Sequence, residues 1–309
     1  MNKRQSNIEL LRIISIFLIM VVHATYLTFG TPTPHEIQAK PLGSFFFIGL
    51  ENVSVICVDI FVLISGWFGI HPKVKSIGGL LFQCVYFGLI MAIFFGVTGI
   101  QPLGATTLAK CMVNYPHFVM CYIVMYLMTP VLNAFVEHAS RIQFRNMLIG
   151  LYSWAFIFGW FIHNDDSFAG GNSALAFMGL YLLARYIRIH CTFPPRVQKA
   201  RVWGVIWLAN VLIVTAAVWA SSYFGFSLKV SNVLLNMTTS YLSPNVILAA
   251  ISLLMCFAHF EFKSTAVNRI AVSAFASVLT HGYAMSNVYI PLIQDLYKAS
   301  PFVTFLCEA

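Results

Sequence analysis

Residues 7–23 read N-I-E-L-L-R-I-I-S-I-F-L-I-M-V-V-H, an apolar run that nevertheless contains Arg12 and His23. The two residues are eleven positions apart, which places them about 20° apart around a helix and about 16 Å apart along it. A membrane-spanning helix keeps such residues only where they face protein, water or substrate, because a charge in lipid costs several kcal/mol. We therefore expect a buried polar site on one face of this first helix.

The composition of the chain predicts a membrane protein. Of its 309 residues, 59% are hydrophobic and only 9% are charged, and the mean hydropathy is +0.81. A soluble domain has about a quarter charged residues, whereas a helix that crosses a hydrocarbon core needs about 20 apolar residues. Such runs lie at 8–29, 45–70, 77–99, 117–136, 146–162, 170–188, 202–224, 243–260 and 269–290. We expect an all-α, polytopic transmembrane helix bundle of about nine spans, forming one domain over residues 1–309.

The distribution of Lys and Arg predicts the orientation of this bundle. With the N-terminus inside, the inner segments hold thirteen basic residues, namely Lys3, Arg4, Lys73, Lys75, Arg141, Arg145, Arg185, Arg188, Arg196, Lys199, Arg201, Lys263 and Arg269. The outer segments hold four, Lys40, Lys110, Lys229 and Lys298. The positive-inside rule therefore predicts a multi-pass protein of the cell membrane with a cytoplasmic N-terminus. The net charge of +8 follows from this topology, and no basic cluster interleaved with aromatic residues suggests a nucleic-acid partner.

Several functional classes have no support in the sequence. It contains no H-E-x-x-H, no G-x-x-x-x-G-K-[ST], no G-x-G-x-x-G and no G-x-S-x-G string, so we predict no metal site, nucleotide fold or serine hydrolase. The seven cysteines are scattered and show no C-x-x-C spacing. They are expected to be small hydrophobic residues of the core.

Several motifs along the chain form one pattern. The N-terminal part combines the Arg-x10-His string with D-x-F-x-x-x-S-G, in the order Glu9, Arg12, His23, V-D-I-F-V-L-I-S-G-W-F at 58–68, Lys73 and Lys75. The pattern continues with H-F-V-M-C-Y-I-V-M-Y-L-M-T-P-V-L-N at 117–133, S-A-L-A-F-M-G-L-Y-L-L-A-R-Y-I-R at 173–188 and A-S-V-L-T-H at 276–281. Over almost its whole length the chain resembles the integral-membrane acyltransferase-3 family.

This resemblance implies an enzyme of the bacterial inner or plasma membrane. It would transfer an acyl group, most often acetyl, from cytoplasmic acyl-CoA to a hydroxyl of a saccharide or cell-envelope glycan. Acyl-CoA is then the donor substrate, no bound cofactor is expected, and membrane lipid surrounds the protein. A hydroxyl is a weak nucleophile, so we expect His23 to act as general base. We expect Arg12, about 6 Å above the inner boundary, to position the phosphates or the pantetheine arm of the donor.

The depths of the ionisable residues predict how they pair. Counting 1.5 Å per residue from span boundaries at 8 and 45, His23 and Glu51 lie about 22 and 21 Å above the inner face, and Arg12 and Asp59 about 6 and 9 Å above it. Pairing Glu51 with His23 and Asp59 with Arg12 is the least costly way to bury four ionisable groups. We expect each pair to lie close enough for a hydrogen bond or for one intervening water. The two carboxylates differ by about 80° in azimuth, so both pairings need not hold.

Each candidate residue also has a structural interpretation. Besides His23, Arg12, Glu51 and Asp59 as the catalytic set, the resemblance suggests substrate contacts from Lys73, Lys75, His281 and Glu9. Arg12 could instead form an ion pair with Glu9 or Asp59 that only holds helices together. Lys73 and Lys75 are topology-setting charges in the first place, and binding of CoA phosphates is their second interpretation.

Two other functions compete with acyl transfer. One is a transporter or flippase of a lipid-linked saccharide, for which the buried charges would line a polar pathway. The other is an inactive remnant, because members of the family usually have at least ten spans and this sequence stops early in an apolar run, S-P-F-V-T-F-L-C-E-A. We expect that a last transmembrane helix is missing.

Overall fold

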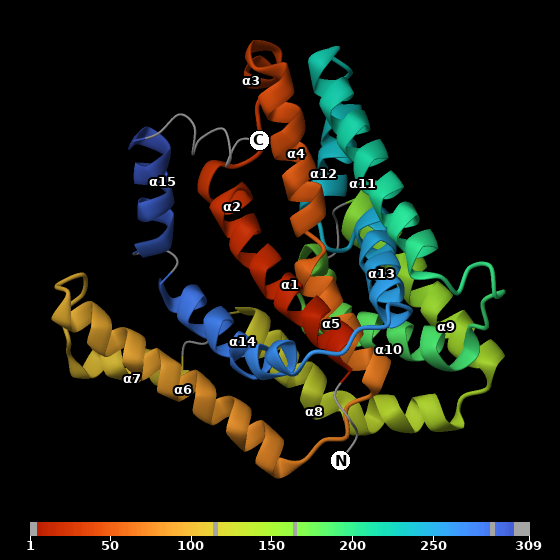
Figure 1. The fold of residues 1–309 in the computed structure, drawn as a ribbon, viewed down its shortest axis with the longest axis horizontal. Coiled ribbons are helices and arrows are strands. Elements are labelled where there is room, and N and C mark those ends of the chain that lie inside the picture. The colour runs from red at the N-terminus through yellow and green to blue at the C-terminus, as the bar shows by residue number, and fades with distance from the viewer. Residues whose placement is uncertain (1–4, 114–116, 163–165, 285–287, 300–309) are drawn as a thin grey trace.

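The computed structural model describes residues 5–113, 117–162, 166–284 and 288–299, and in these residues it is all-helical (Figure 1). This confirms the expected all-α bundle. The elements are α1 (Ser6–Ala24), α2 (Tyr26–Phe29), α3 (Pro34–Ala39), α4 (Pro41–Ser54), α5 (Cys57–Phe68), α6 (Val74–Val97), α7 (Ala105–Val113), α8 (His117–His138), α9 (Arg141–Trp154), a π-helical turn η1 (Ala155–Phe161), a 3-10 segment η2 (Asp166–Gly171), α10 (Ala174–His190), α11 (Ala200–Tyr223), α12 (Leu228–Thr239), α13 (Pro244–Ala258), α14 (Thr265–Ala284) and α15 (Ile290–Ala299).

Six helical segments of the described chain are long and apolar enough to cross a membrane. They are Ser6–Phe29, Pro41–Phe68, Val74–Val97, His117–His138, Ala200–Tyr223 and Val233–Ala258. The three other runs predicted as spans are also helical, in α9 with η1, in α10 and in α14. The protein is therefore a multi-pass helical bundle, while the count of nine crossings stays a prediction. Residues 300–309, on which the expectation of a missing last helix rests, lie outside the described residues.

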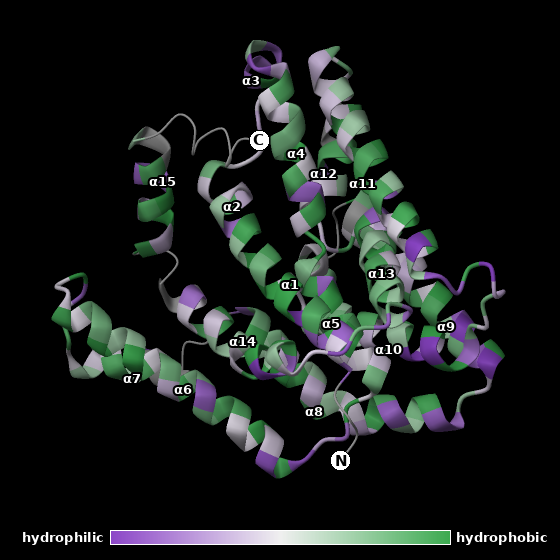
Figure 2. Ribbon diagram, in the orientation of Figure 1, coloured by the Kyte–Doolittle hydropathy of each residue, from purple (hydrophilic) through white to green (hydrophobic). Residues whose placement is uncertain are grey.

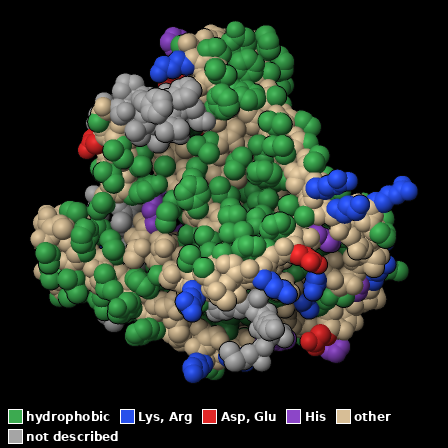
Figure 3. Space-filling view, in the orientation of Figure 1, with side chains coloured by type: hydrophobic (Ala, Val, Ile, Leu, Met, Phe, Trp, Pro, Cys, Tyr) green, Lys and Arg blue, Asp and Glu red, His purple; other side chains and the backbone are tan. Residues whose placement is uncertain are grey.

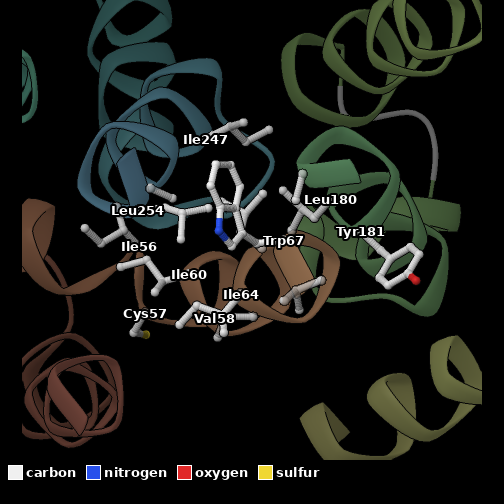
Figure 4. Close-up of a cluster of buried hydrophobic side chains, with 14 of the residues drawn as sticks. Ile56, Cys57, Val58, Ile60, Ile64, Trp67, Leu180, Tyr181, Ile247 and Leu254 are labelled. Atoms are coloured by element: carbon white, nitrogen blue, oxygen red, sulfur yellow. The ribbon is translucent and has the colours of Figure 1, made fainter. Parts of the chain in front are cut away.

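Helix α5 is the centre of the bundle. Its sequence C-V-D-I-F-V-L-I-S-G-W-F is apolar apart from Asp59 and Ser65, which is typical of a helix buried all round. Ile60, Val62 and Leu63 have no exposed surface, and α5 packs against α1, α10 and α13. Figure 4 shows the indole of Trp67 between Leu180 of α10 and Ile247 and Leu254 of α13.

The turn that ends α5 is fixed by a polar network. Gly69 has φ +75°, a backbone conformation that glycine adopts readily. The following residue is held on both sides, because the Ile70 N–H donates to the Tyr181 hydroxyl at 3.0 Å and Asn133 Nδ2 donates to the Ile70 carbonyl at 2.7 Å. Tyr181 in turn donates to Asn133 Oδ1 at 2.6 Å. The network joins the end of α5 to α8 and α10.

Helices α6 and α7 form an arm at the edge of the bundle (Figure 1). The arm reaches the rest of the protein mainly through α14 and through a small cluster of Cys84, Val119 and Leu279. Green, apolar residues dominate α6 and α11 along their length in Figure 2, and Phe82, Ile93 and Phe94 of α6 are exposed. In Figure 3 hydrophobic side chains cover the middle of the face in view, while most Lys and Arg lie toward its right and lower edges. This distribution is that of a protein surrounded by lipid.

The contact between α5 and α10 predicts that Gly66 tolerates no side chain. A Cβ atom at Gly66 would lie 2.5 Å from the Tyr181 carbonyl oxygen and 2.8 Å from Ala184 Cβ, and helix backbones cannot shift as a flexible side chain can. Gly66→Ala should lower the free energy of unfolding by about 1–3 kcal/mol, measured as a lower thermal unfolding temperature in detergent.

Gly78 provides the matched control for this substitution. It lies inside α6 and a Cβ there meets nothing within 4 Å, so Gly78→Ala should be neutral or stabilise the helix by up to about 1 kcal/mol. A Gly66→Ala variant that unfolds at or above the wild-type temperature would contradict the close packing of α5 on α10.

Candidate functional site

His23 and His281 form a hydrogen-bonded pair between α1 and α14. His23 Nδ1 lies 2.6 Å from His281 Nε2, and the rings stack with centroids 4.8 Å apart and planes 13° from parallel. His281 is buried, and His23 is partly buried. The structure thus brings together two residues that the sequence analysis had singled out 258 positions apart, and it leaves Nε2 of His23 for another partner.

The local sequence around His23 shapes the end of its helix. Helix α1 stops at Ala24, where the last carbonyls have no intrahelical donors. Two threonines supply donors here: Thr25 donates to the Val21 carbonyl through both its backbone N–H and its Oγ1, each at 2.9 Å, and Thr28 Oγ1 donates to the carbonyl of His23 itself at 2.6 Å. His23 therefore sits in the last turn of α1 on a backbone that side-chain hydroxyls hold in place.

Arg12 pairs within its own helix. Its Nη1 lies 2.7 Å from Glu9 Oε2, with the two side chains 31% and 11% exposed. This is the spacing of three residues at which opposite charges meet on a helix surface. Arg12 also interacts electrostatically with Tyr122 of α8, whose hydroxyl lies 3.1 Å from Ser65 Oγ of α5. The pair with Glu9 is one of the two structural alternatives considered from the sequence.

Glu51 and Asp59 do not pair as the depth argument predicted. Both are buried, with 2% and 0% of their surface exposed, and neither carboxyl has a hydrogen-bond partner among the described residues. The predicted contacts of Glu51 with His23 and of Asp59 with Arg12 are therefore wrong as direct contacts. Counting residues predicts depth but not direction: His23 faces α14, and Arg12 reaches one turn down its own helix to Glu9.

Two tyrosines lie within electrostatic range of Asp59. Tyr152 of α9 and Tyr241, just before α13, both interact electrostatically with it. The Tyr152 hydroxyl also has no hydrogen-bond partner among the described residues. The interior next to α5 therefore holds polar atoms that none of the described residues satisfies by a hydrogen bond.

Lys73 and Lys75 lie at the start of α6 and are exposed. The backbone N–H of Lys73 donates to the Tyr126 hydroxyl at 3.0 Å, which attaches this turn to α8. The side chains are free to serve either as topology-setting charges or as contacts for an anion, the two interpretations that the sequence allowed.

Tyr289 is a member of the site that the sequence analysis missed. Its ring stands edge-on to His281 at a centroid distance of 4.3 Å, and its hydroxyl donates to the Met20 carbonyl of α1 at 2.9 Å. The residue lies at the end of the last predicted span. A polar aromatic residue eight positions after His281, about two helical turns away, was the only signal available.

A pocket of about 350 Å³ lies beyond the His23 end of α1. Its lining includes Phe29, His35, Glu36, Lys40 and Phe47. Glu36 belongs to a capping box with Thr33 at the start of α3, and hydrogen bonds from the Thr33 backbone and side chain lower the pKa of Glu36. Its carboxylate is therefore ionised at neutral pH, beside aromatic and basic side chains.

Comparisons of this chain with protein-family models, with curated proteins and with solved structures found no match. No three His, Cys, Asp or Glu side chains gather as a metal-binding group in the part of the chain that the structure describes. The candidate site consists of the histidine pair, the arginine–glutamate pair on the same helix and the two buried carboxyls.

The different surroundings of the carboxyls predict opposite effects of neutral substitutions. An ionised carboxylate without a partner is costly to bury, so Asp59→Asn should leave the thermal unfolding temperature unchanged or raise it. Glu9→Gln removes the charge bonded to Arg12 and should lower the free energy of unfolding by up to about 1 kcal/mol, the value for a partly exposed pair. If Asp59→Asn lowered the free energy of unfolding as much as Glu9→Gln does, that result would indicate that Asp59 is paired with Arg12 after all.

Proposed function

We propose that this protein transfers an acyl group, most simply acetyl, from acyl-CoA to a hydroxyl of a saccharide or cell-envelope glycan within the membrane. The observation that carries the proposal is the His23–His281 hydrogen bond of 2.6 Å. In enzymes, a histidine that acts as general base commonly has its second ring nitrogen hydrogen-bonded to a group that orients the ring. The motif resemblance described above supports the same activity.

The proposed reaction requires one of the two tautomers that this hydrogen bond allows. If the His23 Nδ1–H donates to His281 Nε2, then His23 Nε2 carries a lone pair and accepts a proton. His23 Nε2 takes the proton of the acceptor hydroxyl as its oxygen attacks the thioester carbonyl. The tetrahedral intermediate then expels the CoA sulfur, which receives the proton from the imidazolium, so the products are an ester and free CoA. His281 acts as a positioning residue, and Tyr289 packs against its ring.

The other groups take positions that suit the two substrates. Arg12 lies about 16 Å from His23 along α1 and its side chain is 31% exposed, so it suits the phosphates or the arm of the donor. Lys73 and Lys75 are exposed at the start of α6 and add positive charge for the same anion. The pocket beyond His23, with Phe29, Glu36 and Phe47 in its lining, is our candidate for the acceptor.

The buried carboxyls favour a second candidate function. Glu51 and Asp59 have no hydrogen-bond partners among the described residues, and unpaired ionisable groups inside a membrane protein are typical of ion and substrate pathways. A transporter of a lipid-linked saccharide would use them. Saccharide export that continues without acyl-CoA, and stops in a Glu51→Gln or Asp59→Asn variant, would favour that function over acyl transfer.

The test is transfer of isotopically labelled acetyl from acetyl-CoA to envelope glycans by membranes that contain the protein. His23→Ala should reduce the transfer at least about a hundredfold, the usual contribution of a general base. His281→Ala should reduce it less, since the base remains but loses its orientation. His138→Ala is the control, because His138 is an exposed residue at the end of α8.

Unchanged acetyl transfer by the His23→Ala variant, expressed at the normal level, would contradict the assignment of His23 as general base. No labelled glycan from the wild-type protein, in a host whose own glycans carry acetyl groups, would contradict acyl transfer altogether. Mass measurement of the host glycans with and without this protein identifies the acceptor.

A further inference from the structure

A second pocket lies at the opposite end of the bundle from the one beyond His23. It has a volume of about 260 Å³ and is lined by Trp67, Ile187, Arg188, Cys191, Thr192, Phe193, Gln198, Met255, Ala258 and His259. These residues come from the last turns of α5, α10 and α13 and from the loop between α10 and α11. No residue of α1 or α14 lines it, so it is separate from the histidine pair.

The wall of this pocket is ordered by its own contacts. The Arg188 guanidinium lies over the Trp67 ring, 4.5 Å from its centroid, which holds the long side chain in one place. In the loop, Gln198 Nε2 donates to the Phe193 carbonyl at 2.6 Å, and the Val197 N–H donates to the Pro194 carbonyl at 2.8 Å. Phe193 packs edge-on against Trp203 at 5.2 Å. The pocket is therefore formed before any ligand enters.

The polar groups of the pocket suit an anion. His259 Nδ1 donates to the Met255 carbonyl at 2.8 Å, so Nε2 is the ring nitrogen that is left to contact a ligand. Arg188 supplies several fixed donors and Thr192 supplies a hydroxyl. No Asp or Glu lines the pocket, and Glu261, the nearest acid along the chain, is exposed outside it.

The surroundings add positive charge. Arg196, Lys199 and Arg201 are exposed in and just after the same loop. The other lining is apolar, with Ile187, Met255 and Ala258, and basic pockets between helix ends on the cytoplasmic side are suited to phosphate-bearing lipid headgroups. The sequence predicts that this end of the bundle faces the cytoplasm.

We propose that this pocket binds a phosphate group through Arg188, His259 and Thr192. The phosphate is carried by the headgroup of an anionic phospholipid or is free in solution. The planar guanidinium held over an aromatic ring and the hydroxyl are donors for phosphate oxygens, and the free Nε2 of His259 can accept from the P–OH of a protonated phosphate. The apolar side of the pocket accommodates the stem of a lipid.

The experiment titrates the purified full-length protein in detergent with dioctanoyl phosphatidic acid and follows bound lipid by native mass spectrometry. Dioctanoylglycerol, which lacks the phosphate, is the matched neutral ligand. Arg188→Gln should weaken retention of phosphatidic acid about tenfold or more, the usual effect of losing a charged hydrogen bond. Arg201→Gln, which removes an exposed charge that does not line the pocket, should change it little.

The two sources of phosphate are separated by competition with millimolar inorganic phosphate. Displacement of the lipid indicates a site for free phosphate, and retention indicates a headgroup site; either result supports the proposal. Equal retention of dioctanoylglycerol, or equal effects of Arg188→Gln and Arg201→Gln, would overturn it. Thermal unfolding checks that Arg188→Gln folds, and His259→Gln gives the same comparison if it does not.

Discussion

The arrangement of this protein depends on one constraint: a polar side chain inside an apolar layer costs free energy unless it finds a partner within the protein. His23 finds its partner on another helix, through the 2.6 Å hydrogen bond to His281. Arg12 finds its partner, Glu9, within its own helix. Tyr181 and Asn133 are hydrogen-bonded to each other beside the turn that follows α5. The bonds of His23 with His281 and of Tyr181 with Asn133 join different helices, so they fix the geometry that non-directional packing against α5 leaves open.

The all-helical fold followed from composition and apolar runs, because the length of a run directly reflects the thickness that a helix must cross. The predicted runs coincide with helices throughout the described chain. The partners of the ionisable residues were harder to predict, since residue counting gives depth but says nothing about which helices are neighbours. Helix α14 follows α1 by some 240 residues and nevertheless packs along it. Depth alone paired His23 with Glu51, whereas the neighbouring helix supplies His281 instead.

The unpaired carboxyls show a second limit in predicting side-chain partners from the sequence. The sequence argument assumed that every buried charge is matched, yet Glu51 and Asp59 lie in the interior without hydrogen bonds to the described residues. Groups of this kind mark functional positions more often than structural ones. Asp59 lies on the core helix α5 and Glu51 on α4, which precedes it in the chain, while the histidine pair lies between α1 and α14.

The contact of His23 with His281 is the central claim, and cross-linking measures it most directly. In a background without native cysteines, His23→Cys is combined either with His281→Cys or with Glu51→Cys, and membranes are treated with a short bifunctional thiol reagent. The structure predicts an efficient cross-link between positions 23 and 281, because the two rings are in direct contact, and little between 23 and 51. Efficient cross-linking of 23 with 51 and none of 23 with 281 would contradict the histidine pair.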